Sequence, residues 1–134
     1  MARTPRASGV LDASVILAAI YSEPGGNLSE DQLRRSRVST VNAAEVEAKL
    51  IQRLGLDGHQ LAGIWSDLSC GLVPFSASTA RRAAYLLAAH RHRGLSLGDA
   101  ACLATAAQLG VCAWTADRLW AELEGLSIEV RLIR

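Results

Sequence analysis

The stretch from Gly94 to Ala116 constrains the fold most, because Asp99 is its only charged residue. Its small and apolar side chains are typical of a helix packed inside a core, beginning near Ser96 and ending at Gly110. Two Thr, one Gln and Gly110 interrupt the stretch, so it falls short of a membrane span. An acid at the start of such a helix needs a reason. A local one exists, since Ser96 and Asp99 have the spacing of a capping box.

Length and charge indicate one domain. The chain has 134 residues, of which 50% are apolar, and its net charge is +1. We therefore expect a single domain over residues 1–134, with residues 1–8 as a flexible tail. No apolar run follows Arg3 and Arg6 before Asp12, which argues against a signal peptide. Lys49 is the only Lys among 14 basic residues; the excess of Arg suits phosphate binding but is equally typical of a GC-rich genome.

The cysteines predict the compartment. Cys70, Cys102 and Cys112 are odd in number, follow no metal-binding spacing and stand in apolar surroundings. This favours buried, reduced thiols over disulfides or a zinc site. We expect a cytoplasmic protein without a membrane segment.

Short apolar runs alternate with helical segments along the chain. The expected strands are 9–12, 37–41, 71–75, 111–115 and 127–133. The expected helices are 14–21, 28–35, 42–54, 57–68, 78–92, 96–109 and 117–124, with Asn42 capping the third. Pro74 favours a sheet edge for strand 71–75. The alternation predicts an α/β fold of three layers, with a central, mostly parallel sheet of about five strands and helices on both faces.

Four acids stand where such a sheet binds ligands, outside the carboxyl ends of its strands. Asp12 ends the first strand, and Asp117 follows the fourth. Glu45 and Asp99 are expected in the first turns of two helices. Each acid alone can be explained as a helix cap or by the helix dipole. Together they would repel one another, which a hard divalent cation, Mg²⁺ or Mn²⁺, would relieve.

The surrounding residues resemble the four acidic motifs of PIN-domain ribonucleases, in the family's order and spacing. The matching stretches are Val10-Leu-Asp12-Ala-Ser14, Ser39-Thr-Val-Asn-Ala-Ala-Glu45-Val, Leu97-Gly-Asp99-Ala with Ala104-Thr-Ala-Ala107, and Thr115-Ala-Asp117. The resemblance spans nearly the whole chain and is strongest to the VapC-type toxins of bacterial toxin–antitoxin pairs. One departure is Trp120, where the family often has Phe, and Arg118 stands directly beside the acid.

The resemblance implies a metal-dependent endoribonuclease that leaves a 5′-phosphate, works as a homodimer and is blocked by a VapB-type antitoxin. Asp12 and Asp99 would be direct metal ligands, with Glu45 and Asp117 bound directly or through water. The cation would lower the pKa of a bound water and offset charge on the phosphodiester. Residues that can orient the carboxylates, or else serve as caps and strand residues, are Ser14, Asn42 and Thr115.

Two surfaces are candidates for partners. Arg91, Arg93 and Arg118 either contact RNA phosphates beside the acids or, for the first two, complement a helix dipole. Helices 42–54 and 57–68 carry more apolar side chains than one sheet face covers, which predicts a dimer or antitoxin surface.

Other protein classes fit less well. A phosphatase of the Asp-x-Asp type needs an acid where Ser14 stands, and a receiver domain needs a Lys late in the chain, whereas Lys49 is the only one. The remaining alternative is a catalytically weak PIN-like domain that acts as an RNA- or protein-binding module. That interpretation would be favoured by a missing acid, and all four are present.

Overall fold

The computed structural model describes residues 8–134, whose five strands form one parallel sheet in the order β3-β2-β1-β4-β5. The strands are β1 (Gly9–Leu11), β2 (Ser36–Ser39), β3 (Gly71–Val73), β4 (Ala113–Thr115) and β5 (Val130–Leu132). The predicted tail, 1–8, lies outside the described residues except for Ser8. The backbone N–H of Ser8 donates to the carbonyl of Arg35 at 2.7 Å, just ahead of β2.

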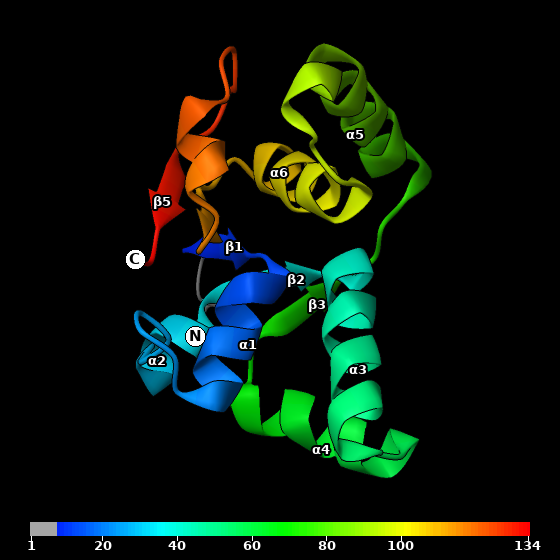
Figure 1. The fold of residues 1–134 in the computed structure, drawn as a ribbon, viewed down its shortest axis with the longest axis vertical. Coiled ribbons are helices and arrows are strands. Elements are labelled where there is room, and N and C mark those ends of the chain that lie inside the picture. The colour runs from blue at the N-terminus through cyan, green and yellow to red at the C-terminus, as the bar shows by residue number, and fades with distance from the viewer. Residues whose placement is uncertain (1–7) are drawn as a thin grey trace, which may run out of the picture.

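Helices cover both faces of the sheet, which confirms the predicted three-layer α/β fold (Figure 1). The α-helices are α1 (Ala13–Tyr21), α2 (Glu30–Arg34), α3 (Thr40–Leu54), α4 (Gly58–Leu68), α5 (Ala77–Ala89) and α6 (Leu97–Leu109). Helices α5 and α6 lie on one face, and α1 to α4 lie on the other. Within residues 8–134, no helix is both long and apolar enough to cross a membrane.

The sheet separates two cores because strand side chains alternate between its faces. Val10 packs into the core beneath α5 and α6, whereas its neighbour Leu11 packs into the core formed with α1 and α3. Both side chains are buried. The central strand β1 therefore contributes to each core in turn, as expected for a strand covered on both faces.

Helix α6 is the buried helix that the sequence predicts. Ser96 caps it, and Gly110 ends it in the left-handed region at φ 68°. Its residues from Ala100 to Ala106 are all buried. Because most of these side chains are small, α6 lies close to the sheet, and the Cys102 thiol lies 3.9 Å from the carbonyl oxygen of Val10.

One predicted cap is wrong. Ser39, the last residue of β2, caps α3 by accepting from the backbone N–H of Val41 at 3.3 Å, so the strand passes directly into the helix. Asn42 consequently lies inside the first turn with a buried side chain. Glu45, predicted in the first turn, falls more than one turn from the helix start. The local sequence favours Asn as a cap, but the hydroxyl at the strand exit precedes it.

Several elements are shorter than predicted. Strand β3 stops at Val73 because Pro74 cannot donate to the ladder, and β3 lies at the sheet edge as predicted. Helix α5 ends at Ala89 and is followed by a 3₁₀ turn, η1 (Arg91–Arg93). The segment predicted as helix 117–124 is a 3₁₀ helix, η2 (Arg118–Glu122).

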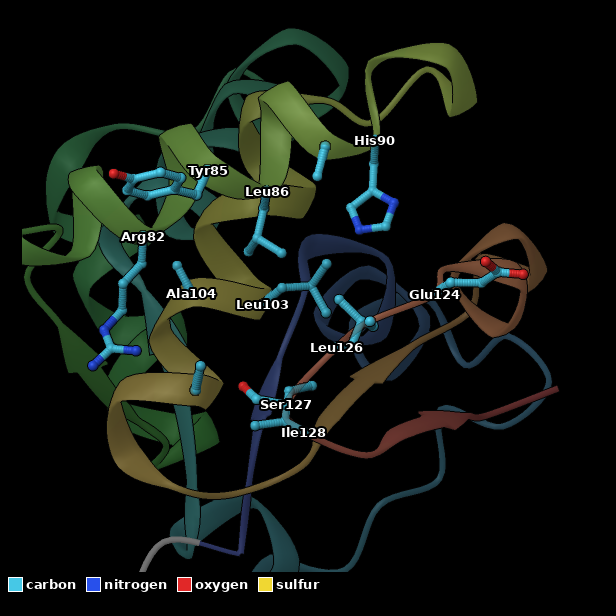
Figure 2. A pocket seen from close by; sticks show the side chains of 13 residues that line it. Arg82, Tyr85, Leu86, His90, Leu103, Ala104, Glu124, Leu126, Ser127 and Ile128 are labelled. Atoms are coloured by element: carbon cyan, nitrogen blue, oxygen red, sulfur yellow. The ribbon is translucent and has the colours of Figure 1, made fainter.

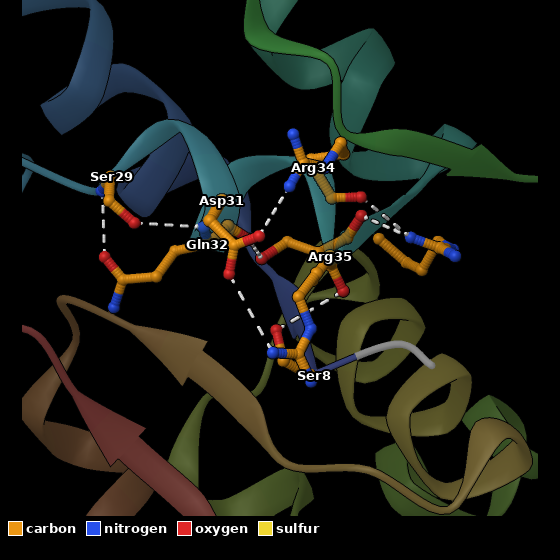
Figure 3. Close-up of polar contacts among 8 residues, drawn as sticks. Ser8, Ser29, Asp31, Gln32, Arg34 and Arg35 are labelled. Atoms are coloured by element: carbon orange, nitrogen blue, oxygen red, sulfur yellow. Dashed lines mark hydrogen bonds and ion pairs between the residues drawn. The ribbon is translucent and has the colours of Figure 1, made fainter. Parts of the chain in front are cut away.

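The amino ends of β1 and β2 are tied together around α2 (Figure 3). Ser29 and Gln32 form a capping box at the start of α2, and Asp31 pairs with Arg34 at 2.6 Å. The Ser8 hydroxyl also donates to the Arg35 carbonyl. These contacts stabilise the end of the sheet where the strands begin. The four acids lie at the opposite end, where the strands finish.

Candidate active site

The four acids follow the carboxyl ends of β1, β2 and β4 or begin the helix that covers them. From β1 the chain adds β2 and β3 on one side and later β4 and β5 on the other. The strand order therefore reverses between β1 and β4, which is where parallel sheets of this kind bind ligands. Asp12 follows β1 directly, and Asp117 lies two residues beyond Thr115, the last residue of β4.

Asp12 is the most constrained of the acids. The residue is only 5% exposed, and its side chain caps α1 by accepting from the backbone N–H of Val15 at 3.1 Å. The hydroxyl of Ser14 donates to Oδ1 at 2.6 Å, and the hydroxyl of Thr115 donates to Oδ2 at 2.6 Å. Each carboxylate oxygen is thus fixed by at least one donor.

Burial raises the pKa of the Asp12 carboxyl above its usual value of 3.8. The hydrogen bonds from Ser14, Thr115 and the Val15 N–H lower this pKa, while the charge of Asp99 raises it further. Desolvation and the charge of Asp99 together therefore outweigh the three donors. The ionised carboxylate at this position gains from any added positive charge.

The two hydroxyls also join β1 to the loop after β4. Thr115 Oγ1 accepts from the backbone N–H of Asp117 at 3.0 Å, and Ser14 Oγ accepts from the backbone N–H of Ala116 at 2.9 Å. The exposed Asp117 caps η2 by accepting from the Leu119 N–H. Asp117 is therefore positioned relative to Asp12 through Thr115.

On the other side of the site, Asn42 joins α3 to α6. Its Nδ2 donates to Oε1 of Glu45 at 2.9 Å and to the carbonyl oxygen of Gly98 at 3.0 Å. Asn42 is 1% exposed, so a buried side chain binds both the Glu45 carboxyl group and the Gly98 carbonyl. Gly98 lies within the matching stretch Leu97-Gly-Asp99-Ala, but the sequence analysis assigns it no role; the available signal is a glycine in the first turn of a helix, directly before an acid.

Asp99 takes part in the capping box that its spacing predicts. Its backbone N–H donates to Ser96 Oγ at 3.1 Å, and its Oδ2 accepts from the backbone N–H of Ser96 at 3.0 Å. The side chain is half-buried. A capping role and a role in the site are compatible, because the capping bond uses one carboxylate oxygen.

The thiol of Cys102 reports which acids the fold brings together. Burial raises its pKa well above 9.0, and the charges of Asp12, Asp99 and Glu45 raise it further. Asp12, Asp99 and Glu45 are therefore each near enough to α6 for their charges to act on this thiol. Cys102 is fully buried, so we assign it no chemistry.

The chemistry of these groups fits a hard divalent cation, since all four offer carboxylate oxygens and Asp12 is poorly solvated. Among residues 8–134, no three His, Cys, Asp or Glu side chains are close enough to hold a metal ion as they are placed. Glu45 and Asp117 are the exposed members of the set of four acids, and Asp12 is the buried one.

Two short helices carry the predicted RNA-binding arginines. Arg93 of η1 forms an ion pair with Glu122 of η2 at 3.6 Å, which places η1 beside η2. Arg91 and Arg118 are exposed and form no ion pair within the described part of the chain. Arg118 directly follows Asp117, so its position beside the acids is fixed by the chain itself.

A separate hollow of about 440 Å³ lies between α5, α6 and the segment 124–128 (Figure 2). Leu86, Leu103 and Leu126 point into it, and His90 and Glu124 lie at one end. None of the four acids lines this hollow. It is therefore distinct from the candidate site.

The apolar excess predicted on helices α3 and α4 is partly core. Val46, Leu50 and Leu61 are buried, whereas Ile51 and Leu54 on α3 are 49% and 57% exposed. Ile51 and Leu54 are three residues apart and share a helix face. These two side chains form an exposed apolar pair on α3.

The three cysteines are free thiols, and the predicted burial is confirmed for Cys70 and Cys102 but wrong for Cys112. Cys70 and Cys102 are buried, whereas Cys112 is half-buried and its thiol donates to the carbonyl of Ser8 at 3.3 Å.

Comparisons with known proteins agree with this architecture. A toxin–antitoxin complex from Klebsiella pneumoniae is similar in structure at 19% identity and a TM-score of 0.69, covering 95% of this chain and 98% of that one. VapBC2 from Rickettsia felis, bound to a DNA fragment from its promoter, matches at 16% identity and a TM-score of 0.69, covering 90% of this chain and 96% of that one.

A third similar structure is VapC20 from Mycobacterium tuberculosis, a toxin that cleaves the sarcin-ricin loop. It matches at 20% identity and a TM-score of 0.62, covering 86% of this chain and 95% of that one. At these identities the likeness concerns the fold. A search of curated proteins finds no match. The family model of the PIN domain matches residues 9–126, and this chain belongs to the PIN domain family.

Proposed function

We propose that this protein is a Mg²⁺- or Mn²⁺-dependent endoribonuclease and the toxin of a toxin–antitoxin pair. The observation that carries the proposal is the Asp12 carboxylate, which is buried, fixed by Ser14 and Thr115, and close enough to Asp99 for its charge to raise the Asp12 pKa. A purely structural cap would not need a second carboxylate nearby. Membership of the PIN domain family supports the same interpretation.

Asp12 and Asp99 would hold the cation directly, with Glu45 and Asp117 bound directly or through water. When bound, the cation would lower the pKa of a water and offset negative charge on the phosphodiester. Ser14 and Thr115 keep the Asp12 oxygens oriented, and Asn42 holds Glu45. Fixed carboxylates reduce the rearrangement needed at the moment of reaction.

RNA has to approach a site with four acids. Arg91 and Arg118 are exposed beside the segments that carry Asp99 and Asp117. Arg93 lies near them because its ion pair with Glu122 joins η1 to η2. We propose that these arginines bind phosphates on either side of the scissile bond, since a guanidinium group matches phosphate in a two-pronged geometry. The cleavage product would carry a 5′-phosphate.

The partners we propose are a second copy of this chain and a VapB-type antitoxin. Structural neighbours that are toxin–antitoxin complexes support the antitoxin. The exposed pair Ile51 and Leu54 supports a protein-covered face on α3. Free thiols at Cys70, Cys102 and Cys112 support a reducing compartment, and we propose the cytoplasm.

The function is tested by incubating the purified protein with a mixed RNA pool in Mg²⁺, in Mn²⁺ and in EDTA. We expect cleavage with either cation, none in EDTA, and 5′-phosphate ends on the products. Asp12→Asn should be inactive in all three conditions. RNA binding without cleavage by the wild type in Mg²⁺ and Mn²⁺ would contradict the nuclease and favour the RNA-binding module.

A further inference from the structure

Gly98 stands at a place in α6 where the backbone does not require glycine. It lies in the first turn of the helix, and its φ is outside the left-handed region. Glycine is less favourable than alanine in a helix because it loses more conformational freedom on folding. The reason for a glycine here must therefore come from outside the helix.

The structure shows what a side chain at Gly98 would meet. A Cβ placed there would lie 2.6 Å from Cδ and 2.7 Å from Oε2 of Glu45, and closer still to Oε1. These three atoms are its nearest neighbours beyond its own turn of helix, and all belong to one carboxyl group. The Glu45 carboxyl group thus packs against the bare Cα of Gly98.

Asn42 holds the carboxyl group in this place. Its Nδ2 donates both to Glu45 Oε1 and to the Gly98 carbonyl. A flipped amide would place Oδ1, an acceptor, next to these two acceptor oxygens, so the flip is disfavoured. Oδ1 is buried and has no hydrogen-bond partner within residues 8–134. The amide keeps this orientation because of the two bonds at Nδ2.

We propose that Gly98 is a positioning residue for the nuclease reaction, whose missing side chain leaves the space that the Glu45 carboxylate needs beside Asp99. This rests on the proposed function, in which Glu45 contributes to the metal site. Helices α3 and α6 are joined here by the carboxyl–glycine contact and by Asn42, so the spacing of Glu45 and Asp99 is set by one close approach between the two helices.

Gly98→Ala separates this role from a role in folding. The atoms that a new Cβ would displace are the far end of a flexible side chain, so Glu45 turns away while the helices stay in place. Alanine also favours the helix. We expect a metal-free melting temperature equal to or above that of the wild type, together with weaker metal binding and slower cleavage.

The matched control is Gly63→Ala on α4, where the added Cβ meets nothing within 4 Å. We compare wild type, Gly98→Ala and Gly63→Ala in four measurements. These are the metal-free melting temperature, the rise in melting temperature with Mn²⁺, kcat/KM on RNA, and the carboxyl ¹³C NMR shift of Glu45. We expect about a 10–100-fold loss of kcat/KM, a smaller rise with Mn²⁺ and a moved Glu45 shift for Gly98→Ala alone.

A Glu45→Asp background supplies an independent check. Its shorter side chain draws the carboxylate back from Gly98, so adding Gly98→Ala there should cause no further loss of the Mn²⁺-dependent rise. A Gly98→Ala protein that matches Gly63→Ala in kcat/KM, Mn²⁺ response and Glu45 shift overturns this inference and leaves the nuclease standing. A wild type that neither responds to Mn²⁺ nor cuts RNA overturns the proposed function, and the positioning role with it.

Discussion

The hydroxyl of Thr115 donates a 2.6 Å hydrogen bond to Oδ2 of Asp12, which joins residues 103 positions apart in sequence. The same hydroxyl accepts from the backbone N–H of Asp117. The Thr115 side chain therefore links the acid after β1 to the backbone of the acid after β4, beside the second link that Ser14 makes to Ala116.

Thr115→Val should destabilise the metal-free protein, because it leaves a buried carboxylate oxygen and the Asp117 N–H without this partner. We expect a loss of about 1–3 kcal/mol in the free energy of unfolding, measured with urea. The control is Thr105→Val, which also removes a buried hydroxyl but one that donates to the Ala101 carbonyl within α6, where the loss should be smaller. Equal losses at the two positions would show that the bond to Asp12 has no special weight.

Asp12 should make the metal-free protein less stable as pH rises. Its raised pKa means that the folded state holds the proton at pH values where the unfolded chain, near 3.8, has lost it. The protonated Asp12 therefore favours the fold below pH 3.8, and this contribution is lost as pH rises through the folded pKa.

The measurement compares the free energy of unfolding of wild type and Asp12→Asn in EDTA from below pH 3.8 to neutral pH. The difference should shift in favour of the variant as pH rises. Adding Mn²⁺ at neutral pH should reverse this shift, because only the wild type binds the cation. A difference that stays constant with pH would show that burial leaves the Asp12 pKa unchanged.

Asp99→Asn distinguishes a cap from a metal ligand. Asn keeps an oxygen for the Ser96 N–H, so the change should cost at most about 1 kcal/mol of stability. Removing one of several crowded charges should offset this cost in the metal-free protein. We expect the variant to lose both RNA cleavage and the rise in melting temperature with Mn²⁺.

The control for this change is Asp57→Asn, which alters the capping box of α4 away from the four acids. It should retain cleavage and the Mn²⁺ response. An Asp99→Asn protein that cuts RNA at the wild-type rate would leave Asp99 with its capping role alone.

Replacing Arg91, Arg93 and Arg118 by alanine should weaken RNA binding across sequences. The slope of log affinity against log salt concentration is negative. Its magnitude should decrease by about 0.7 for each phosphate of a single strand that the variant no longer neutralises. The Mn²⁺ response should not change, because these arginines donate no metal ligand. Replacing Arg34, Arg35 and Arg53 removes the same charge from α2 and the end of α3, and it should leave the slope nearly intact. Equal slopes in the two triple variants would show that Arg91, Arg93 and Arg118 do not bind RNA phosphates specifically. Their roles would then be structural, such as the Arg93–Glu122 ion pair.

Sedimentation tests the exposed apolar pair on α3. We expect a wild-type dimer and an Ile51→Lys/Leu54→Lys variant that sediments as a monomer, because charges cannot be buried at an apolar interface without partners. Leu109→Lys alters a side chain of similar exposure, 42%, at the end of α6 and should remain a dimer. A wild type that sediments as a monomer would count against this surface.

Local patterns were enough to predict the alternation of strands and helices. Apolar runs identified all five strands within a few residues, and the Ser96 cap and Gly110 bounded α6. They failed at Asn42, where two capping residues compete within four positions and the end of β2 decides between them. They also overextended β5, which spans Val130–Leu132, and the helix after β4, which is the 3₁₀ helix η2.

The order of the four acids along the chain, their places at the ends of strands and helices, and the resemblance to the PIN family follow from the sequence alone. Only the tertiary structure decided that Thr115 binds Asp12, that Asn42 faces inward, and that the Glu45 carboxyl group packs against Gly98. These contacts join segments far apart in the chain. Their geometry depends on how β1 and β4 pair and on how closely α3 and α6 approach each other, and many side chains together set these distances rather than any one motif.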